Sequence, residues 1–216
     1  VFIFCIFILY LFIENIFLQR LYKILFLSIA VLIWEPVIFF FLFFMCIDII
    51  KGRLDRLDKK FFYNLVCFFP AVFLALFIAF NPMTIENHDK MAIFLKTNFN
   101  ESCYMSCALL KTKSSILDQF RGNYHKYSIE VFFRYSMIII VGFAPLIILI
   151  KNSILNSQNL LFFRNFKNLF LPCIFMLSPV ILLFAMGYDW GRWVNIGYVF
   201  TVCFYFYLLK TKKITL

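Results

Sequence analysis

Residues 186–193 read Met-Gly-Tyr-Asp-Trp-Gly-Arg-Trp and separate two apolar runs, Leu169 to Ala185 and Val194 to Leu209. Each run approaches the ~18 apolar residues that indicate a membrane-spanning helix. The stretch between them holds an acid, a base, two tryptophans and two of the six glycines of the chain. A charged connector between two spans lies at a membrane surface, so the flanks determine the fold class and the connector is a candidate site.

The composition supports a membrane fold for the whole chain. Hydrophobic residues make up 64% of the sequence and charged residues 15%, whereas average proteins are roughly half apolar. A soluble domain of this length could not bury so much apolar surface. We therefore predict an all-α fold, a single polytopic transmembrane helical bundle over residues 1–216 with about six to seven membrane segments.

The net charge of +10 does not indicate a nucleic-acid partner, because the bases cluster at the ends of apolar runs. That distribution is typical of cytoplasmic loops, and membrane lipids with anionic headgroups are the partners we expect for it. Three clusters are predicted to be cytoplasmic: Lys51 to Lys60, Lys151 to Lys167, and the C-terminal Lys210 to Lys213.

The chain opens on Val1 inside an apolar run, without the basic region or cleavage site of a signal peptide. We expect the C-terminal part of a longer protein, located in a bacterial inner membrane with its C-terminus in the cytoplasm. The segment over residues 81–131 is expected to be an extracytoplasmic loop. Within it, Glu101 to Phe120 could form an interfacial helix.

The segment from Gln19 to Ile50 has two interpretations. Gln19 to Lys23 is expected to be a short basic connector, and Trp34-Glu35-Pro36 interrupts the apolar run that follows. One long helix would put Arg20 and Lys51 on opposite membrane faces. A helical hairpin over residues 17–50 would put both on one face, and proline disfavours helix at the preceding residue. Charge distribution favours the hairpin.

Asp189 and Arg192 are three residues apart, so on a helical turn they would be neighbours and could pair. One interpretation is a structural ion pair, with Trp190 and Trp193 as ordinary interfacial aromatics. The other is an anion site in which Arg192 binds a phosphate and Asp189 orients the Arg192 guanidinium. Charged residues at membrane depth are often functional, and both interpretations remain open.

Three further positions carry ionisable or thiol groups of interest. A carboxylate buried at Glu35 could act as a general base or could be purely structural. Cys103 and Cys107 share the long loop at a spacing that is poor for a bridge within a helix, although a loop conformation could permit one. The spacings match no metal or cofactor motif, so we expect neither a metal nor a cofactor.

Two pieces of the chain resemble the Wzy/EpsG-like polysaccharide polymerases, which are O-antigen and exopolysaccharide assembly proteins of the bacterial inner membrane. The residues that carry the resemblance are Tyr10-Leu11-Phe12-Ile13, Arg20, Lys23, Ile33-Trp34-Glu35-Pro36 with Val37 to Phe44, and Asp189-Trp190-Gly191-Arg192-Trp193. The sequence departs from the family at the hairpin tip, where Trp34 stands in place of an expected histidine.

The resemblance implies polymerisation or transfer of a polyprenyl-pyrophosphate-linked glycan at the outer face of the membrane. It implies catalytic carboxylates at Glu35 and Asp189, and pyrophosphate binding by Arg192 with Trp190 and Trp193. Other glycan-assembly membrane proteins would be its partners. The alternatives are a glycan or lipid transporter and a non-catalytic assembly subunit.

Overall fold

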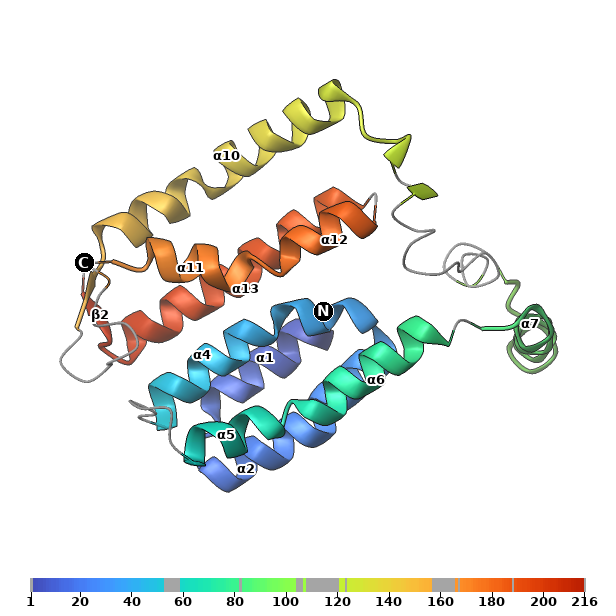
Figure 1. Cartoon of the computed structure of the whole chain (residues 1–216), viewed down its shortest axis with the longest axis horizontal. Coiled ribbons are helices and arrows are strands. Elements are labelled where there is room, and N and C mark those ends of the chain that lie inside the picture. Colours follow the sequence, from blue (N-terminus) through green and yellow to red (C-terminus); the bar gives the residue numbers. More distant parts are fainter. Residues whose placement is uncertain are drawn as a thin grey trace.

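The computed structural model describes residues 2–52, 59–81, 83–103, 107, 121–122, 124–156, 166, 168–187 and 189–215. Helices dominate this part of the chain, which confirms the all-α fold (Figure 1). The strands described are β1 (Ile154–Leu155) and β2 (Ile214–Thr215), which pair antiparallel.

Residues 2–52 form a short first helix followed by a helical hairpin. The first helix is α1 (Phe2–Phe12), the outgoing arm comprises α2 (Ile16–Tyr22), the π-helix η1 (Lys23–Leu27) and α3 (Ser28–Ile33), and the return arm comprises the 3-10 helix η2 (Glu35–Phe40) and α4 (Phe41–Gly52). Trp34 between the arms is extended, with φ −156° and ψ 97°. Lys23 and Asp48 form an ion pair across the arms, so the hairpin interpretation is correct and the single long helix is wrong.

The predicted basic connector Gln19 to Lys23 is wrong, because these residues lie inside the outgoing arm. The chain instead breaks between α1 and α2, where Asn15 caps α2 by accepting hydrogen bonds from the backbone N–H groups of Phe17 and Leu18. Asparagine is among the preferred N-cap residues. The outgoing arm is therefore 18 residues long, and Lys23 enters the bundle.

The remaining helices among the described residues are α5 (Lys59–Val66), α6 (Phe69–Phe80), α7 (Ile85–Phe99), α10 (Ile129–Asn152), α11 (Phe170–Leu177), α12 (Val180–Met186) and α13 (Trp190–Lys210). Prolines mark their irregularities. Pro70 lies at the start of α6, directly after the break from α5, and Pro179 directly precedes α12. Pro145 lies within the continuous α10, as neighbouring helices permit in membrane proteins.

Four helical stretches among the described residues are long and apolar enough to cross a membrane: Ile16–Ile33, Lys59–Phe80, Ile129–Asn152 and Trp190–Lys210. Phe2–Phe12 and Phe170–Met186 are apolar but shorter. Large apolar side chains cover the outside of α6 and α10, including Phe80, Phe133 and Val141. Such extensive exposed apolar surface is expected of a protein that lies in lipid. The number of spans predicted from the sequence, six to seven, exceeds the four that satisfy these limits.

The bundle has two chemically different ends. At one end, on the left in Figure 1, lie Lys51 at the end of α4, Lys59 at the start of α5, Lys151 at the end of α10 and Lys210 at the end of α13. We call this the basic end. The β1–β2 pairing lies here and ties the chain after α10 to the chain after α13. At the opposite end, α12 turns into α13 and the hairpin reverses at Trp34.

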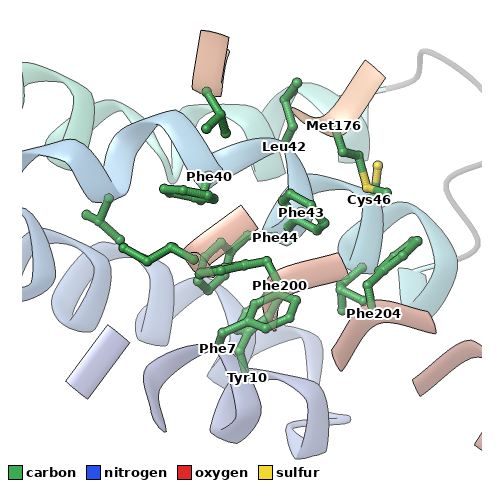
Figure 2. Packing of buried hydrophobic residues seen from close by; sticks show 14 of the residues in the cluster. Phe7, Tyr10, Phe40, Leu42, Phe43, Phe44, Cys46, Met176, Phe200 and Phe204 are labelled. Carbon is green, nitrogen blue, oxygen red and sulfur yellow. The ribbon is translucent and has the colours of Figure 1, made fainter. Parts of the chain in front are cut away.

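The core is built from aromatic rings that α1, the return arm and α13 contribute (Figure 2). Phe200 of α13 lies at its centre, with ring centroids 4.6 Å from Phe7 and 4.8 Å from Phe40. Phe43 and Phe204 extend the contact along the same helices. Because lipid tails are as apolar as these side chains, close ring packing rather than exclusion of water holds such helices together.

The long segment between α6 and α10 contains α7, which lies beside the bundle beyond the end of α6 (Figure 1). The helix begins at the N-cap Thr84, whose hydroxyl accepts from the backbone N–H of Asn87. It ends at Asn100, which has the left-handed φ of 53° and reverses the chain. Most of the helix predicted over Glu101 to Phe120 falls outside the described residues.

Candidate functional site

The turn from α12 into α13 is shorter than the sequence predicts. Helix α12 ends at Met186 and α13 begins at Trp190, so the residues from Trp190 to Trp193 form the first turn of a helix instead of a connecting loop. Gly187 is extended, and a Cβ atom added there would lie 3.3 Å from the Trp193 ring. The small residue therefore permits Trp193 to pack closely against the end of α12.

Asp189 and Arg192 pair across this first helical turn, as their spacing predicts. An Arg192 guanidinium nitrogen lies 2.8 Å from Asp189 Oδ2. Both side chains remain open to solvent, with 60% of the Arg192 side chain and 49% of the Asp189 side chain exposed. An exposed pair contributes at most about 1 kcal/mol to stability. A guanidinium carries five N–H donors in a planar fork, so this pair still allows Arg192 to bind a phosphate.

Trp190 and Trp193 are buried, in contrast to the exposed Asp189–Arg192 pair. The Trp190 indole N–H donates to the Phe184 carbonyl at 2.8 Å, and that of Trp193 donates to the Gly187 carbonyl at 3.4 Å. The Trp190 ring also contacts the ring of Tyr127, whose hydroxyl donates to the carbonyls of Phe184 and Ala185. Both tryptophans thus position the turn, and their indole donors are engaged by the backbone.

The hairpin tip reaches the same place from the other half of the chain. The Trp34 ring stacks on the Trp193 ring, with centroids 5.5 Å apart and an interplanar angle of 24°. Glu35, the residue after Trp34, is half-buried in the first turn of η2. We call this end of the bundle the tryptophan end. The structure therefore gathers Glu35, Asp189 and Arg192 at one end, opposite the basic end.

Comparison with protein-family models, curated proteins and solved structures finds no match. The functional argument for this chain therefore rests on its own residues and their geometry.

An apolar cavity of about 300 Å³ adjoins the tryptophan end. It lies between α10, α11, α12 and α13, and Phe184, Trp193 and Val194 line the part nearest the turn. A second cavity of about 660 Å³ lies at the basic end, where Lys51, Lys210 and Lys213 line it together with Glu14. Basic cavities between membrane helices suit anionic lipid headgroups.

A cluster of charged side chains inside the hairpin has no counterpart in the sequence predictions. The Lys23 ammonium pairs with the Asp48 carboxylate, and the Tyr10 hydroxyl donates to the same carboxylate. The exposed fraction is 1% for the Lys23 side chain and 3% for that of Asp48. The Lys23 ammonium also lies 4.8 Å from the centre of the Phe68 ring. A buried charge is tolerated only when it is paired and hydrogen-bonded, and here both charges are.

Lys51 lies one turn beyond Asp48 and extends this cluster. We call Tyr10, Lys23, Asp48 and Lys51 together the buried polar layer. Its ammonium donates to the carbonyls of Tyr10, Leu11 and Ile13 at 3.0, 2.6 and 2.7 Å. Tyr10 and Leu11 lie in the last turn of α1 and Ile13 directly follows it, and the last carbonyls of a helix need partners from outside its own ladder. Lys51 therefore joins α1 to the return arm.

One sequence signal points to this buried layer. Asp48 is an acid near the end of an apolar run, and ionisable groups inside membrane segments usually pair with another polar group. In the structure Lys23 also starts a π-helix, a distortion found frequently at functional sites. The sequence alone does not give their contact, because the register of the hairpin decides which base faces Asp48.

The long loop contains a second polar cluster. Cys103 and Cys107 form a disulfide, with their Cα atoms 5.2 Å apart. The His88 Nε2 atom lies 3.3 Å from Cys103 Sγ, and the Nδ1 atom lies 3.3 Å from Asp89 Oδ1.

Proposed function

We propose that this protein acts in cell-surface glycan assembly, where it polymerises or transfers a polyprenyl-pyrophosphate-linked glycan at the outer face of a bacterial inner membrane. The tryptophan end would face outward and the basic end the cytoplasm, in agreement with the positive-inside bias. The C-terminus would then be cytoplasmic, since Lys210 ends α13 at the basic end.

The contact between Trp34 and Trp193 carries this proposal. It brings together two segments more than 150 residues apart in sequence, and these are the two segments that resemble the glycan polymerases. One supplies the carboxylate Glu35, and the other supplies the exposed pair Asp189 and Arg192. Two carboxylates and one cation would thereby lie at the same end of the bundle.

The reaction would join an acceptor sugar to the donor chain. The acceptor hydroxyl oxygen forms a bond to the anomeric carbon, the bond from that carbon to the pyrophosphate oxygen breaks, and the hydroxyl proton passes to a carboxylate. Glu35 or Asp189 would accept the proton. Arg192 would stabilise the charge that develops on the departing pyrophosphate.

The apolar cavity supports a lipid-linked substrate. It is lined by α10, α11, α12 and α13 and reaches Trp193, the neighbour of Arg192. A prenyl chain lying in this cavity would hold its pyrophosphate near the start of α13. Binding energy from such a remote part of a substrate helps to orient the reacting group.

A non-catalytic assembly subunit is the second candidate, and the Asp189–Arg192 ion pair is the observation that favours it. In that case the pair would hold the first turn of α13, and the buried tryptophans would fix the contact between the halves of the bundle. No anion would bind.

A glycan or lipid transporter is the third candidate, and the buried Lys23–Asp48 pair is the observation that favours it. Ionisable groups inside membrane helices often mark transport pathways. The pair is enclosed by Tyr10 and Phe68, whereas a transport pathway requires charges that line an open route.

Surface-glycan chain length, measured by gel electrophoresis of cells carrying the intact protein, tests the proposal. We expect Arg192→Ala, Asp189→Asn and Glu35→Gln to shorten the glycan, and Arg192→Ala to lower the amount of long chains by roughly tenfold or more. Arg134→Ala is the matched control, because Arg134 is an exposed arginine near the same end of the bundle. Immunoblots check the level of each variant. Unchanged glycan length in both Arg192→Ala and Asp189→Asn would overturn the proposal.

A further inference from the structure

His88 is buried, although most of α7 around it is exposed. It lies in the first turn of the helix, and its two ring nitrogens face different partners. Nδ1 lies 3.3 Å from the Asp89 carboxylate, while Nε2 lies 3.3 Å from Cys103 Sγ and 3.0 Å from the Cys107 carbonyl oxygen. A carboxylate on one ring nitrogen orients the other nitrogen, as found for histidines that bind metals.

The chain brings both cysteines back to this histidine. After Asn100 reverses the direction of the chain, Cys103 and Cys107 lie against the first turn of α7. The Nε2 atom of His88 and the two sulfur atoms all lie within 4.8 Å of one another. Two cysteines with one histidine and an open fourth position match the three-ligand Cys2His donor set found in some zinc sites.

We propose that reduction of the Cys103–Cys107 disulfide creates a binding site for a thiophilic metal ion, with Zn²⁺ as the best fit. The ligands are the two thiolates and His88 Nε2, and a water molecule or another donor occupies the fourth position. Nitrogen and sulfur donors of this kind select zinc or copper(I) over magnesium or calcium. This inference concerns the long loop and is independent of the glycan proposal.

The geometry needs only a local adjustment. In a tetrahedral zinc site with Zn–S bonds of ~2.3 Å and Zn–N bonds of ~2.0 Å, two sulfurs lie about 3.8 Å apart and a sulfur and a nitrogen about 3.5 Å apart. The distance from His88 Nε2 to Cys103 Sγ is already 3.3 Å. Once the disulfide bond is broken, the two sulfurs must move from bonding distance to about 3.8 Å apart. Rotation of the cysteine side chains can supply this separation.

The chemistry balances as a two-electron exchange followed by proton release. A dithiol reductant transfers two electrons and two protons to the disulfide, which yields two thiols here and a disulfide in the reductant. Metal binding then releases both thiol protons. Coordination through His88 Nε2 requires the tautomer in which the ring proton has moved from Nε2, where it faces the Cys107 carbonyl oxygen, to Nδ1, where it is donated to Asp89.

Two covalent states of one loop follow from this. Under oxidising conditions Cys103 and Cys107 form a disulfide. Under reducing conditions both thiolates coordinate the same metal ion. Either state holds the chain after Asn100 against the first turn of α7. The site would therefore keep its local fold in both conditions, whereas the reduced, metal-free loop would lose that constraint.

Titration of the purified full chain with Co²⁺ tests the site, because cobalt thiolates absorb in the near ultraviolet and tetrahedral Co²⁺ absorbs in the visible range. After phosphine reduction without oxygen, we expect one Co²⁺ per chain, displaced by Zn²⁺, and no such bands from the oxidised protein. Cys103→Ser, Cys107→Ser and His88→Gln should lose the bands. His125→Gln and Cys67→Ser are matched controls that should keep them.

Asp89→Asn separates a metal site from a folding effect, because it leaves all three ligands in place. Loss of the orienting carboxylate should weaken cobalt affinity about 10–100-fold, with unchanged helical content by circular dichroism. The proposal is overturned if reduced wild-type protein gives no cobalt–thiolate bands. It is equally overturned if His88→Gln, with unchanged helical content, binds Co²⁺ as tightly as the wild type.

Discussion

Trp34 stacks on Trp193 at a centroid distance of 5.5 Å, and this contact joins the hairpin tip to the start of α13. Trp34 ends the outgoing arm in an extended conformation, and Trp193 lies in the first turn of the last helix. The residues beside them, Glu35 and Arg192, carry the charges of the candidate site. The relative position of those charges therefore depends on an aromatic contact.

The energy of this contact can be measured by a double-mutant cycle. Stacked aromatic pairs contribute about 0.5–1.5 kcal/mol beyond their buried area, so Trp34→Ala and Trp193→Ala should show a coupling of that size. Unfolding in detergent, followed by circular dichroism, gives the free energies. Trp34→Phe is the matched variant and should retain part of the coupling. Strictly additive effects of the two alanine substitutions would show that the stacking has no energetic role.

The buried Lys23–Asp48 pair should be costly to break from one side. Removal of one partner leaves an unpaired buried charge, which costs about 3–5 kcal/mol. We therefore expect Asp48→Ala and Lys23→Ala to lower the free energy of unfolding by that amount. Replacement of both by Lys23→Met with Asp48→Leu should cost much less, because no charge is then left unpaired.

The control for this prediction is the exposed pair of Glu86 and Lys90, with side-chain exposures of 77% and 70%. Glu86→Ala should change stability by less than about 1 kcal/mol. If Asp48→Ala costs no more than Glu86→Ala in the same assay, the buried pair does not hold the hairpin together.

Lys51 should stabilise the end of α1. Its ammonium satisfies carbonyls of Leu11 and Ile13, and hydrogen bonds to charged groups contribute about 1.5–3 kcal/mol. Lys51→Met should therefore lower stability by about that amount and speed hydrogen exchange in α1. Lys59→Met, at an exposed lysine of the same end, is the control. Equal hydrogen exchange in α1 for both variants would contradict the capping role.

The disulfide predicts a specific alkylation pattern. Five cysteines are free in the structure: Cys5, Cys46, Cys67, Cys173 and Cys203. Denatured but unreduced protein should gain five labels by mass spectrometry, and reduced protein should gain seven, the number of cysteines in the sequence. Unreduced Cys103→Ser should gain six, because Cys107 loses its partner. Seven labels on unreduced wild-type protein would show that the bridge does not form.

The helical fold and the hairpin could be predicted from the sequence because their causes are local. Apolar run length identifies membrane helices, and Pro36 marks the reversal of the hairpin. The pairing of Asp189 with Arg192 follows from a spacing of three on a helix. Each of these predictions uses residues that are neighbours in sequence.

The buried polar layer could not be predicted in the same way. Arg20 and Lys23 cluster near the end of an apolar run, a pattern that also fits a solvated connector. The break at Asn15 moves both into a helix, and the partner Asp48 lies 25 residues away on the return arm. The contact depends on hairpin register, which small differences in side-chain packing determine.

The structural role of Trp190 and Trp193 could not be predicted from the sequence either, for a related reason. An indole at a membrane surface can bind a ligand or anchor a helix, and the sequence does not distinguish the two. The backbone carbonyls of Phe184 and Gly187 accept the indole N–H groups, and only the turn between α12 and α13 brings those carbonyls into reach.

The charge-swapped variant Asp189→Arg with Arg192→Asp, assayed for surface-glycan length, tests the central claim most directly. The swap preserves an ion pair at the same spacing, removes no capping hydrogen bond from Asp189, and puts an acid in the first helical turn, where the helix dipole favours it. If an anion site requires the cation at position 192, the swapped variant should be present at normal levels and should make glycan as short as that of Arg192→Ala. Wild-type glycan length in the swapped variant, with shortening in the single variants, would contradict the anion site and show that the pair is structural.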